Sequence, residues 1–294
     1  MVWLIGNKGM LGSEIARQLT ENNIRFIGTD RDVDITSYSA IEKFVKQQTS
    51  NNKITYIINC AAYTAVDNAE DSQEIARVLN AEGPKNIAKL AKNINAKMIH
   101  ISTDYVFGGK GTEPYKEDTK RNPLGVYGST KADGERAIEK ETSNYYIFRT
   151  AWLYGFDGKN FVYTMTKLMN SHDSIKVISD QQGTPTYAGD LAHIIVLTIQ
   201  RDNIPFGYYH VTNLGHTNWY EFAKEIYKLG KKAGRITSDC VINACSTAEY
   251  PTKAERPAYS VLDKTKVQKT YAISIPQWQE SLKQFITNSR FKEL

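Results

Sequence analysis

Short apolar runs alternate with amphipathic stretches over the first 150 of the 294 residues, and this alternation limits the possible folds more than any other feature. It is typical of βαβ units, in which parallel strands form a sheet covered by helices. The apolar runs predict buried strands at 2–5, 25–28, 54–59, 97–102 and 145–149. The stretches between them carry apolar residues at spacings of three and four and predict helices at 14–21, 37–48, 74–93 and 129–141. The third of these helices contains Pro84 and should be kinked or broken near Gly83.

The chain after Arg149 has a different character, because turn residues replace the regular alternation. Glycine or proline recurs at 155, 158, 183, 185, 207, 215, 251 and 257. We therefore predict a doubly wound α/β domain over 1–150, rejoined by 185–212, and a smaller mixed α/β lobe formed by 151–184 and 213–294. Within this half, the patterns predict helices at 190–200, 219–229 and 277–286 and a strand at 208–211.

Composition and charge exclude several classes of protein. Hydrophobic residues make up 41% and charged residues 23%, which excludes a disordered chain, and the net charge of +5 comes without a dense basic cluster, so we predict no nucleic-acid partner. Three cysteines without a C-x-x-C pair, and histidines without ligand spacing, predict neither disulfides nor a metal site. His100 is predicted to be a satisfied core histidine. With no basic leader and no apolar run near about 18 residues, we expect a cytoplasmic protein without membrane contact.

A glycine-rich turn joins the first predicted strand directly to the first predicted helix. Gly6, Gly9 and Gly12 form a G-x-x-G-x-x-G pattern in this setting. Glycines there permit a tight turn and a close backbone approach, so that a pyrophosphate can lie on the unpaired N–H groups at the helix N-terminus. The pattern predicts a dinucleotide site that includes Met10 and Leu11. Its structural alternative is a tight turn without a ligand.

Two further strand ends predict which parts of a dinucleotide the chain contacts. The second strand leads to Asp30, 18 residues after Gly12, where a carboxylate can bind the adenosine ribose, while Arg31 beside it can bind a 2′-phosphate. The choice between NADH and NADPH therefore stays open. The remaining predicted contacts are Asp34 and Ile35 near the adenine, with a solvated turn as the alternative, and Ala61, Ala62 and Tyr63 after the third strand, with tight helix packing as the alternative.

Tyr127 and Lys131 carry the predicted chemistry, because on a helix their spacing of four places a phenol and an ammonium on one face. A nearby ammonium lowers a tyrosine pKa from its ordinary value of about 10 toward the range of a proton donor. Thr103 lies 24 residues before Tyr127 and brings a hydroxyl to the same edge of the sheet. The three residues predict a site that donates a proton to a carbonyl group and orients it.

These elements occur in the order and at the spacings of the extended short-chain dehydrogenase/reductase family, which the chain resembles over its whole length. Within that family it is most similar to the dTDP-4-dehydrorhamnose reductases. The resemblance implies a Rossmann-type doubly wound parallel sheet with a smaller mixed α/β substrate-binding lobe. The segments that carry it are 61–67 (AAYTAVD), 102–107 (STDYVF), 123–128 (PLGVYG), 148–155 (FRTAWLYG), 180–186 (DQQGTPT), 256–257 (RP) and Ser260-x-Leu262.

The resemblance also implies an activity, the NADPH- or NADH-dependent reduction of the C4 ketone of dTDP-4-dehydro-β-L-rhamnose to dTDP-β-L-rhamnose, which is the last step of dTDP-rhamnose synthesis. Tyr127 would protonate the C4 alkoxide, Lys131 would hold the nicotinamide ribose, and Thr103 would bind the carbonyl oxygen. Asn80 would support the lysine, against the alternative of a helix-surface amide. The implied substrate contacts are Thr64, Val66, Asp104, Tyr105, Tyr127, Trp152 and Arg256, with core packing as the alternative for Trp152 and a pyrophosphate clamp as the role of Arg256.

Two other functions stay open. The same residues fit a reductase or epimerase that acts on another nucleotide-linked sugar. A relative of this branch is a regulatory partner of methionine adenosyltransferase, so a non-catalytic NAD(P)-binding subunit is the third interpretation. Some members are described as dimers bridged by magnesium through acidic residues, but Gly189 stands beside Asp190 where one such acid is expected, so we predict no metal. We expect a monomer or a homodimer.

Overall fold

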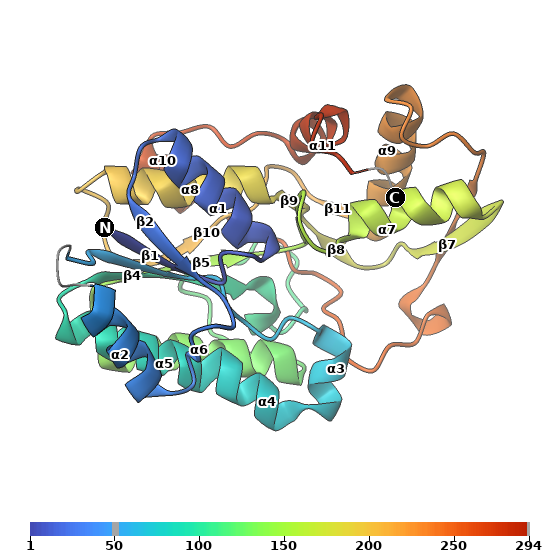
Figure 1. The fold of residues 1–294 in the computed structure, drawn as a ribbon. Helices are drawn as coiled ribbons and strands as arrows, with labels where there is room; N and C mark the ends of the chain where they lie inside the picture. Colours follow the sequence, from blue (N-terminus) through green and yellow to red (C-terminus); the bar gives the residue numbers. More distant parts are fainter. Residues whose placement is uncertain (49–52, 293–294) are drawn as a thin grey trace.

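A six-stranded parallel sheet forms the centre of the computed structural model, which describes residues 1–48 and 53–292 (Figure 1). The strand order is β10-β5-β4-β3-β1-β2, and every neighbouring pair is parallel. The order reverses between β1 and β3, and doubly wound sheets bind their ligands at such a reversal, outside the carboxyl ends of the strands. The strands are β1 (Val2–Ile5), β2 (Phe26–Thr29), β3 (Tyr56–Asn59), β4 (Lys97–Thr103), β5 (Tyr145–Thr150) and β10 (Gly207–His210).

The predicted strands are confirmed, each with ends that differ by at most two residues from the prediction. The predicted and observed strands agree because the strands are buried on both faces of the sheet. Every residue of β1 and β3 is buried, and strands of this kind appear in a sequence as continuous apolar runs. The predicted strand at 208–211 corresponds to β10, which joins the edge of the sheet beside β5.

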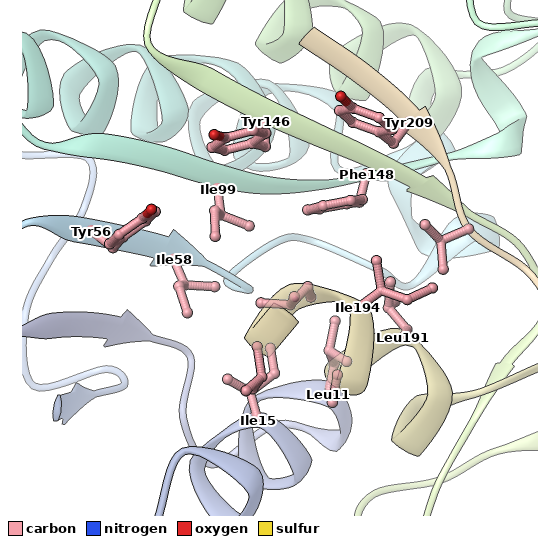
Figure 2. Packing of buried hydrophobic residues seen from close by; sticks show 14 of the residues in the cluster. Leu11, Ile15, Tyr56, Ile58, Ile99, Tyr146, Phe148, Leu191, Ile194 and Tyr209 are labelled. Carbon is pink, nitrogen blue, oxygen red and sulfur yellow. The ribbon is translucent and has the colours of Figure 1, made fainter. Parts of the chain in front are cut away.

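Helices cover both faces of the sheet. On one face, α1 (Met10–Glu21) lies beside α8 (Ala188–Gln200), and Figure 2 shows Ile15 and Leu191 directed toward strand residues such as Ile58. On the other face lie α2 (Tyr38–Gln48), α5 (Gly83–Asn93) and α6 (Val126–Glu141), whose apolar side chains form a second core with the sheet. The helices predicted at 14–21, 37–48, 129–141 and 190–200 are therefore present, although α1, α6 and α8 begin earlier than predicted.

The helix predicted at 74–93 is interrupted, as the position of Pro84 suggested. It consists of α4 (Gln73–Arg77), a π-helical turn η1 (Val78–Glu82) and α5, and it follows the short helix α3 (Val66–Asp71). Pro84 lies in the first turn of α5, where its missing N–H is best tolerated. The π turn brings Asn80, which is fully buried, to the inner side of the helix.

The smaller lobe packs helices around an aromatic core that contains Tyr154, Phe222 and Phe285. Its helices are α7 (Phe161–Ser171), α9 (Trp219–Lys232) and α11 (Trp278–Thr287), which confirm the helices predicted at 219–229 and 277–286. Its strand pairs are β7 (Ser174–Ile178) with β12 (Val241–Cys245), β6 (Leu153–Tyr154) with β9 (Thr186–Tyr187), and β8 (Gln182–Gly183) with β11 (Thr217–Asn218).

Three short helices complete the described part of the chain, namely η2 (Asp104–Val106), η3 (Thr247–Glu249) and α10 (Thr265–Tyr271). Among all helices in the described ranges, none is long and apolar enough to cross a membrane.

Candidate active site

The glycine-rich turn between β1 and α1 forms a cradle that larger side chains would fill. Gly6 has a φ of 77°, and a Cβ atom there would lie 3.0 Å from the backbone nitrogen of Ala61. A Cβ on Gly12 would lie 2.0 Å from the carbonyl oxygen of Gly6, so the helix can approach the turn only without one. No side chain caps α1 at Gly9, so the N–H groups of its first turn, which begins with Met10 and Leu11, remain for an anion. The cradle therefore fits the pyrophosphate of a dinucleotide.

The residues after β2 lie beside this turn. Gly28 of β2 packs against Asn7, because a Cβ on Gly28 would lie 2.4 Å from the Asn7 side-chain nitrogen. Asp30 directly follows β2, its backbone N–H donates to Asp32 Oδ1 at 2.7 Å, and the next residue, Arg31, is exposed. An acidic and a basic side chain thus remain next to each other at the strand end, as the sequence predicted.

Asp34 and Ile35, predicted near an adenine, have structural partners. Asp34 Oδ1 accepts hydrogen bonds from the N–H and the hydroxyl of Thr36, at 2.9 and 2.7 Å. Ile35 is buried and lies against Gly83, where a Cβ would be 2.7 Å from it. These contacts agree with the turn alternative for Asp34 and leave its predicted adenine contact a proposal.

Asn80 connects the loop after β3 to helix α6. Its side chain accepts the N–H of Tyr63 at 2.8 Å and donates to the Tyr63 carbonyl and to the Thr130 hydroxyl, both at 3.1 Å. Because Asn80 is fully buried, the alternative of a helix-surface amide is wrong. These bonds join the loop that contains Tyr63 to Thr130 of α6, so the support of Lys131 that the resemblance implies would act through the position of α6.

Tyr127 lies in the first turn of α6, directly above the end of β4. The close approach depends on Gly128, where a Cβ would lie 2.2 Å from the Tyr105 carbonyl oxygen. The rings of Tyr105 and Tyr127 meet edge to face at 5.6 Å. Burial raises the pKa of Tyr127 to about 12, although the nearby Thr103 hydroxyl acts in the opposite direction. The phenol therefore holds its proton at neutral pH.

Lys131 lies one turn after Tyr127 and is almost completely buried, at 2% exposure. Its Nζ donates to the Ile101 carbonyl at 2.6 Å, and burial lowers its pKa to about 8. The sequence predicted that this ammonium lowers the pKa of Tyr127. That expectation is wrong for the structure, because burial of the phenol dominates and Lys131 is not among the groups that shift its pKa.

The strand end before Tyr127 brings three predicted residues together. The Thr103 hydroxyl donates to Asp104 Oδ1 at 2.9 Å and accepts the N–H of Tyr105 at 3.2 Å. Asp104 is 2% exposed, and burial raises the pKa of its carboxyl to about 6. Burial also raises the pKa of Tyr105. Thr103, Asp104, Tyr105 and Tyr127 thus form one cluster of hydroxyls and a carboxyl at the carboxyl edge of the sheet.

Arg256 reaches α3 from the other lobe. Its guanidinium donates to both carboxylate oxygens of Asp67, at 3.0 and 2.7 Å, and the N–H of Ala254 also donates to Asp67. This pairing lowers the pKa of Asp67 and raises that of Arg256. Thr64 and Val66 precede Asp67 in the same segment, Thr64 being exposed and Val66 starting α3.

Trp152 lies where β5 passes into the smaller lobe, in an unusual backbone conformation with a φ of 47°. Its indole stacks on that of Trp219, with ring centroids 3.5 Å apart and an angle of 11° between the planes. Gly183 lies against its edge, where a Cβ would be 2.5 Å away. Since Trp152 remains partly exposed, both the core-packing and the substrate-facing interpretations fit its position.

Sequence reasoning missed several partners of these residues. Glu70 Oε1 accepts the N–H of Val126 at 2.9 Å and so caps the start of α6. Asp67 lies inside the motif at 61–67, which was the available signal for its pairing with Arg256. His100 contacts Lys131 and Asn59, and only its position on the fourth strand hinted at this. Within residues 1–48 and 53–292, no group of three or more His, Cys, Asp or Glu residues is placed to hold a metal ion.

Comparisons with known proteins agree with this geometry. The family model described as RmlD substrate binding domain matches residues 1–291. A crystal structure of a dTDP-4-dehydrorhamnose reductase from Clostridium acetobutylicum is 43% identical, covers 97% of this chain and 98% of that one, and has a TM-score of 0.90. The dTDP-4-dehydrorhamnose reductase from Bacillus anthracis, solved in complex with NADP, is 35% identical with 97% coverage of both chains and a TM-score of 0.90.

A curated relative of related but different activity is equally similar. It is a probable dTDP-4,6-dihydroxy-2-methyloxan-3-one 4-ketoreductase from Streptomyces antibioticus, 38% identical over 289 residues, which are 97% of this chain and 94% of the relative. The matches span nearly the whole chain and include the sheet, the glycine cradle and the tyrosine–lysine helix. The chain therefore belongs to the dTDP-4-dehydrorhamnose reductase family.

Proposed function

We propose that the protein reduces the C4 ketone of dTDP-4-dehydro-β-L-rhamnose to dTDP-β-L-rhamnose with NADPH or NADH. The observation that carries the proposal is the meeting of Thr103, Tyr127 and Lys131 at the carboxyl edge of the sheet, beside the glycine cradle. Family membership supports the substrate class, because the similar reductases are named for dTDP-linked sugars.

The cradle would hold the cofactor through Gly6, Gly9 and Gly12 and the first N–H groups of α1. When bound, the nicotinamide supplies the hydride. Asp30 would bind the adenosine ribose hydroxyls, and Arg31 would bind a 2′-phosphate if one is present. The remaining cofactor contacts that we propose are Met10, Leu11, Asp34, Ile35, Ala61, Ala62, Tyr63 and Lys131.

Tyr127 would act as the general acid, since its high pKa keeps the phenol protonated at neutral pH until an alkoxide forms beside it. Its hydroxyl proton passes to the C4 oxygen. Thr103, whose hydroxyl lies near that of Tyr127, would bind the same oxygen and keep it in reach of the proton. Lys131 would hold the nicotinamide ribose.

We propose that the segments 1–150 and 185–212 bind the dinucleotide and that 151–184 and 213–294 bind the nucleotide sugar. The pairing of β10 with β5, the packing of α8 on α1 and the separate aromatic core of the smaller lobe support this division. The segment of α10 departs from it, because Val267, Tyr271 and Ile275 pack into the core on the central sheet. Arg256 would bind the diphosphate while Asp67 holds its guanidinium in place. The other proposed substrate contacts are Thr64, Val66, Asp104, Tyr105, Tyr127 and Trp152. We expect a cytoplasmic monomer or homodimer that binds no nucleic acid.

The test is the loss of reduced-nicotinamide absorbance with the dTDP-linked 4-ketosugar, with NADPH and NADH assayed in parallel. Tyr127→Phe should lower kcat by about 10²–10⁴-fold and leave the cofactor Kd within about twofold. Tyr250→Phe is the matched control, because Tyr250 is 56% exposed and should tolerate the change. Wild-type turnover by Tyr127→Phe would contradict the assigned role.

A second function is favoured by the Streptomyces antibioticus relative, whose name specifies a different dTDP-linked ketosugar. Under this alternative, the protein oxidises the cofactor with another dTDP-linked 4-ketosugar and not with the rhamnose precursor. Cofactor binding without oxidation by any ketosugar would instead indicate the non-catalytic regulatory subunit.

A further inference from the structure

A fully buried histidine of β4, His100, lies between the loop after β3 and the lysine of α6. Its Nδ1 is 3.2 Å from Asn59 Nδ2, and its Nε2 is 3.5 Å from Lys131 Nζ. His100 is 0% and Asn59 is 1% exposed, so water cannot replace these partners. The reaction proposed above assigns no role to His100.

The contacts of Asn59 determine which nitrogen of His100 carries the proton. The backbone N–H of Ala61 lies 3.0 Å from Asn59 Oδ1, and since a backbone N–H can only donate, this oxygen must be the acceptor. The amide nitrogen of Asn59 therefore faces His100 and donates to Nδ1. Burial and the charge of Lys131 lower the pKa of His100 well below 6.5, so the ring is neutral. Its single proton is on Nε2, toward Lys131.

The His100 N–H directed at Lys131 Nζ favours the neutral amine of Lys131 over the ammonium. The positive end of this N–H faces the ammonium charge, and the N–H can donate a hydrogen bond only when Nζ is unprotonated. The groups that act in the opposite direction are the Ile101 carbonyl, which accepts from Nζ at 2.6 Å, and the Glu135 carboxylate one turn along α6. Cys60 also lies near Lys131, and Tyr127 lies one turn before it on α6. Burial raises the pKa of both to about 12, so both stay neutral near pH 7.

We propose that His100 is a positioning residue, whose Nε2 proton faces Lys131 Nζ and makes Lys131 release its own proton more readily. The inference deepens the proposed function, since it assumes that Lys131 is the lysine of the reductase site. Its consequence is that the Asn59–His100 pair lowers the upper pH limit of the reaction further, in the same direction as the burial of Lys131.

The first experiment uses ¹⁵N-histidine NMR on the protein without cofactor and does not depend on activity. The His100 signals, identified by their loss in His100→Gln, should show a neutral ring with the proton on Nε2. They should shift with pH around 8 as Lys131 ionises, and the shift should vanish in Lys131→Met. A proton on Nδ1, or signals that do not respond to Lys131, would overturn the proposal even if the protein proved to reduce no sugar.

The second experiment measures the pH profile of kcat. His100→Leu should move the alkaline limb upward by about one pH unit, because the N–H that opposes the ammonium is removed. His100→Gln should keep the limb in place, because its amide can both accept from Asn59 and donate toward Lys131. His172→Leu, at an exposed histidine, is the matched control. If His100→Leu folds and its pH profile equals that of the wild type, the proposal is wrong and His100 has only a structural role.

If His100→Leu does not fold, His100→Gln decides. A shifted alkaline limb in His100→Gln overturns the proposal, and an unshifted limb together with the expected NMR result supports it.

Discussion

The substitution Glu135→Gln tests the buried ion pair that joins α6, the helix with Tyr127 and Lys131, to the sheet. Glu135 is fully buried on α6, and Arg149 of β5 is 2% exposed. The two glutamate oxygens accept from Arg149 Nε and Nη2, both at 2.8 Å, and a third bond comes from Arg121 at 3.1 Å. Glutamine keeps one acceptor oxygen but removes the charge, so the guanidinium of Arg149 stays buried without a counter-charge.

Removing one partner of a buried pair costs about 3–5 kcal/mol, and we expect the lower end because one acceptor remains. At about 2–4 °C per kcal/mol for a chain somewhat smaller than this one, the thermal midpoint should fall by roughly 6–12 °C. The matched control is Glu139→Gln on the same helix, since Glu139 is 32% exposed and pairs with Arg121, so that its loss should cost at most about 1 kcal/mol.

Thermal and urea unfolding of the two variants, compared at one pH and salt concentration, measure the difference. Equal midpoints for Glu135→Gln and Glu139→Gln would refute the reasoning, because they would mean that the buried charge of Arg149 needs no partner. The double variant Glu135→Leu with Arg149→Met should recover part of the loss, since it leaves neither charge buried.

Three further predictions concern the site. Burial raises the pKa of Asp104 to about 6, so the folded protein binds a proton at this carboxyl more tightly than the unfolded chain does. The free energy of unfolding should therefore fall as the pH rises from about 4 through 6. Urea unfolding of Asp104→Asn at pH 4 and pH 6 should not show this fall. Gly12→Ala should lower the thermal midpoint, because the new Cβ would lie 2.0 Å from the Gly6 carbonyl oxygen. In Gly9→Ala the nearest contact of the new Cβ is at 3.4 Å, so the midpoint should not change. This variant should bind the cofactor more weakly, as measured by titration calorimetry. Arg256→Leu should raise the KM for the dTDP-sugar about tenfold or more in steady-state kinetics and leave cofactor affinity unchanged.

Local patterns in the sequence suffice to predict the sheet and the position of the reacting groups. The strands of the central sheet are buried apolar runs that end in turn residues, and the spacing from Thr103 to Tyr127 spans a strand end and the start of the next helix. Because parallel strands present their carboxyl ends at one edge, both hydroxyls had to meet there. The glycine cradle was predictable for the same reason, since its three glycines lie within seven residues of chain.

The pairing of distant side chains was not predictable in this way. Asp67 and Arg256 are 189 residues apart and meet because the segment with Ala254 and Arg256 returns to α3. His100 and Asn59 share a sheet register across β3 and β4, yet the sequence alone offered a satisfied core histidine as the simplest explanation. The partners that make these residues functional come from elements whose relative placement no local pattern encodes.

The protonation of the site shows why electrostatics also needs the fold. The sequence suggested that Lys131 lowers the pKa of Tyr127, because charge and spacing can be read from residue types. Burial cannot be read in this way, and in the folded protein it acts on both groups in opposite senses, raising the pKa of the phenol and lowering that of the ammonium. Tyr127 therefore keeps its proton and Lys131 holds its proton weakly. A buried acid that retains its proton until an alkoxide forms beside it is suited to general-acid catalysis. In this site, burial therefore determines the protonation states of the two groups more than the neighbouring charge does.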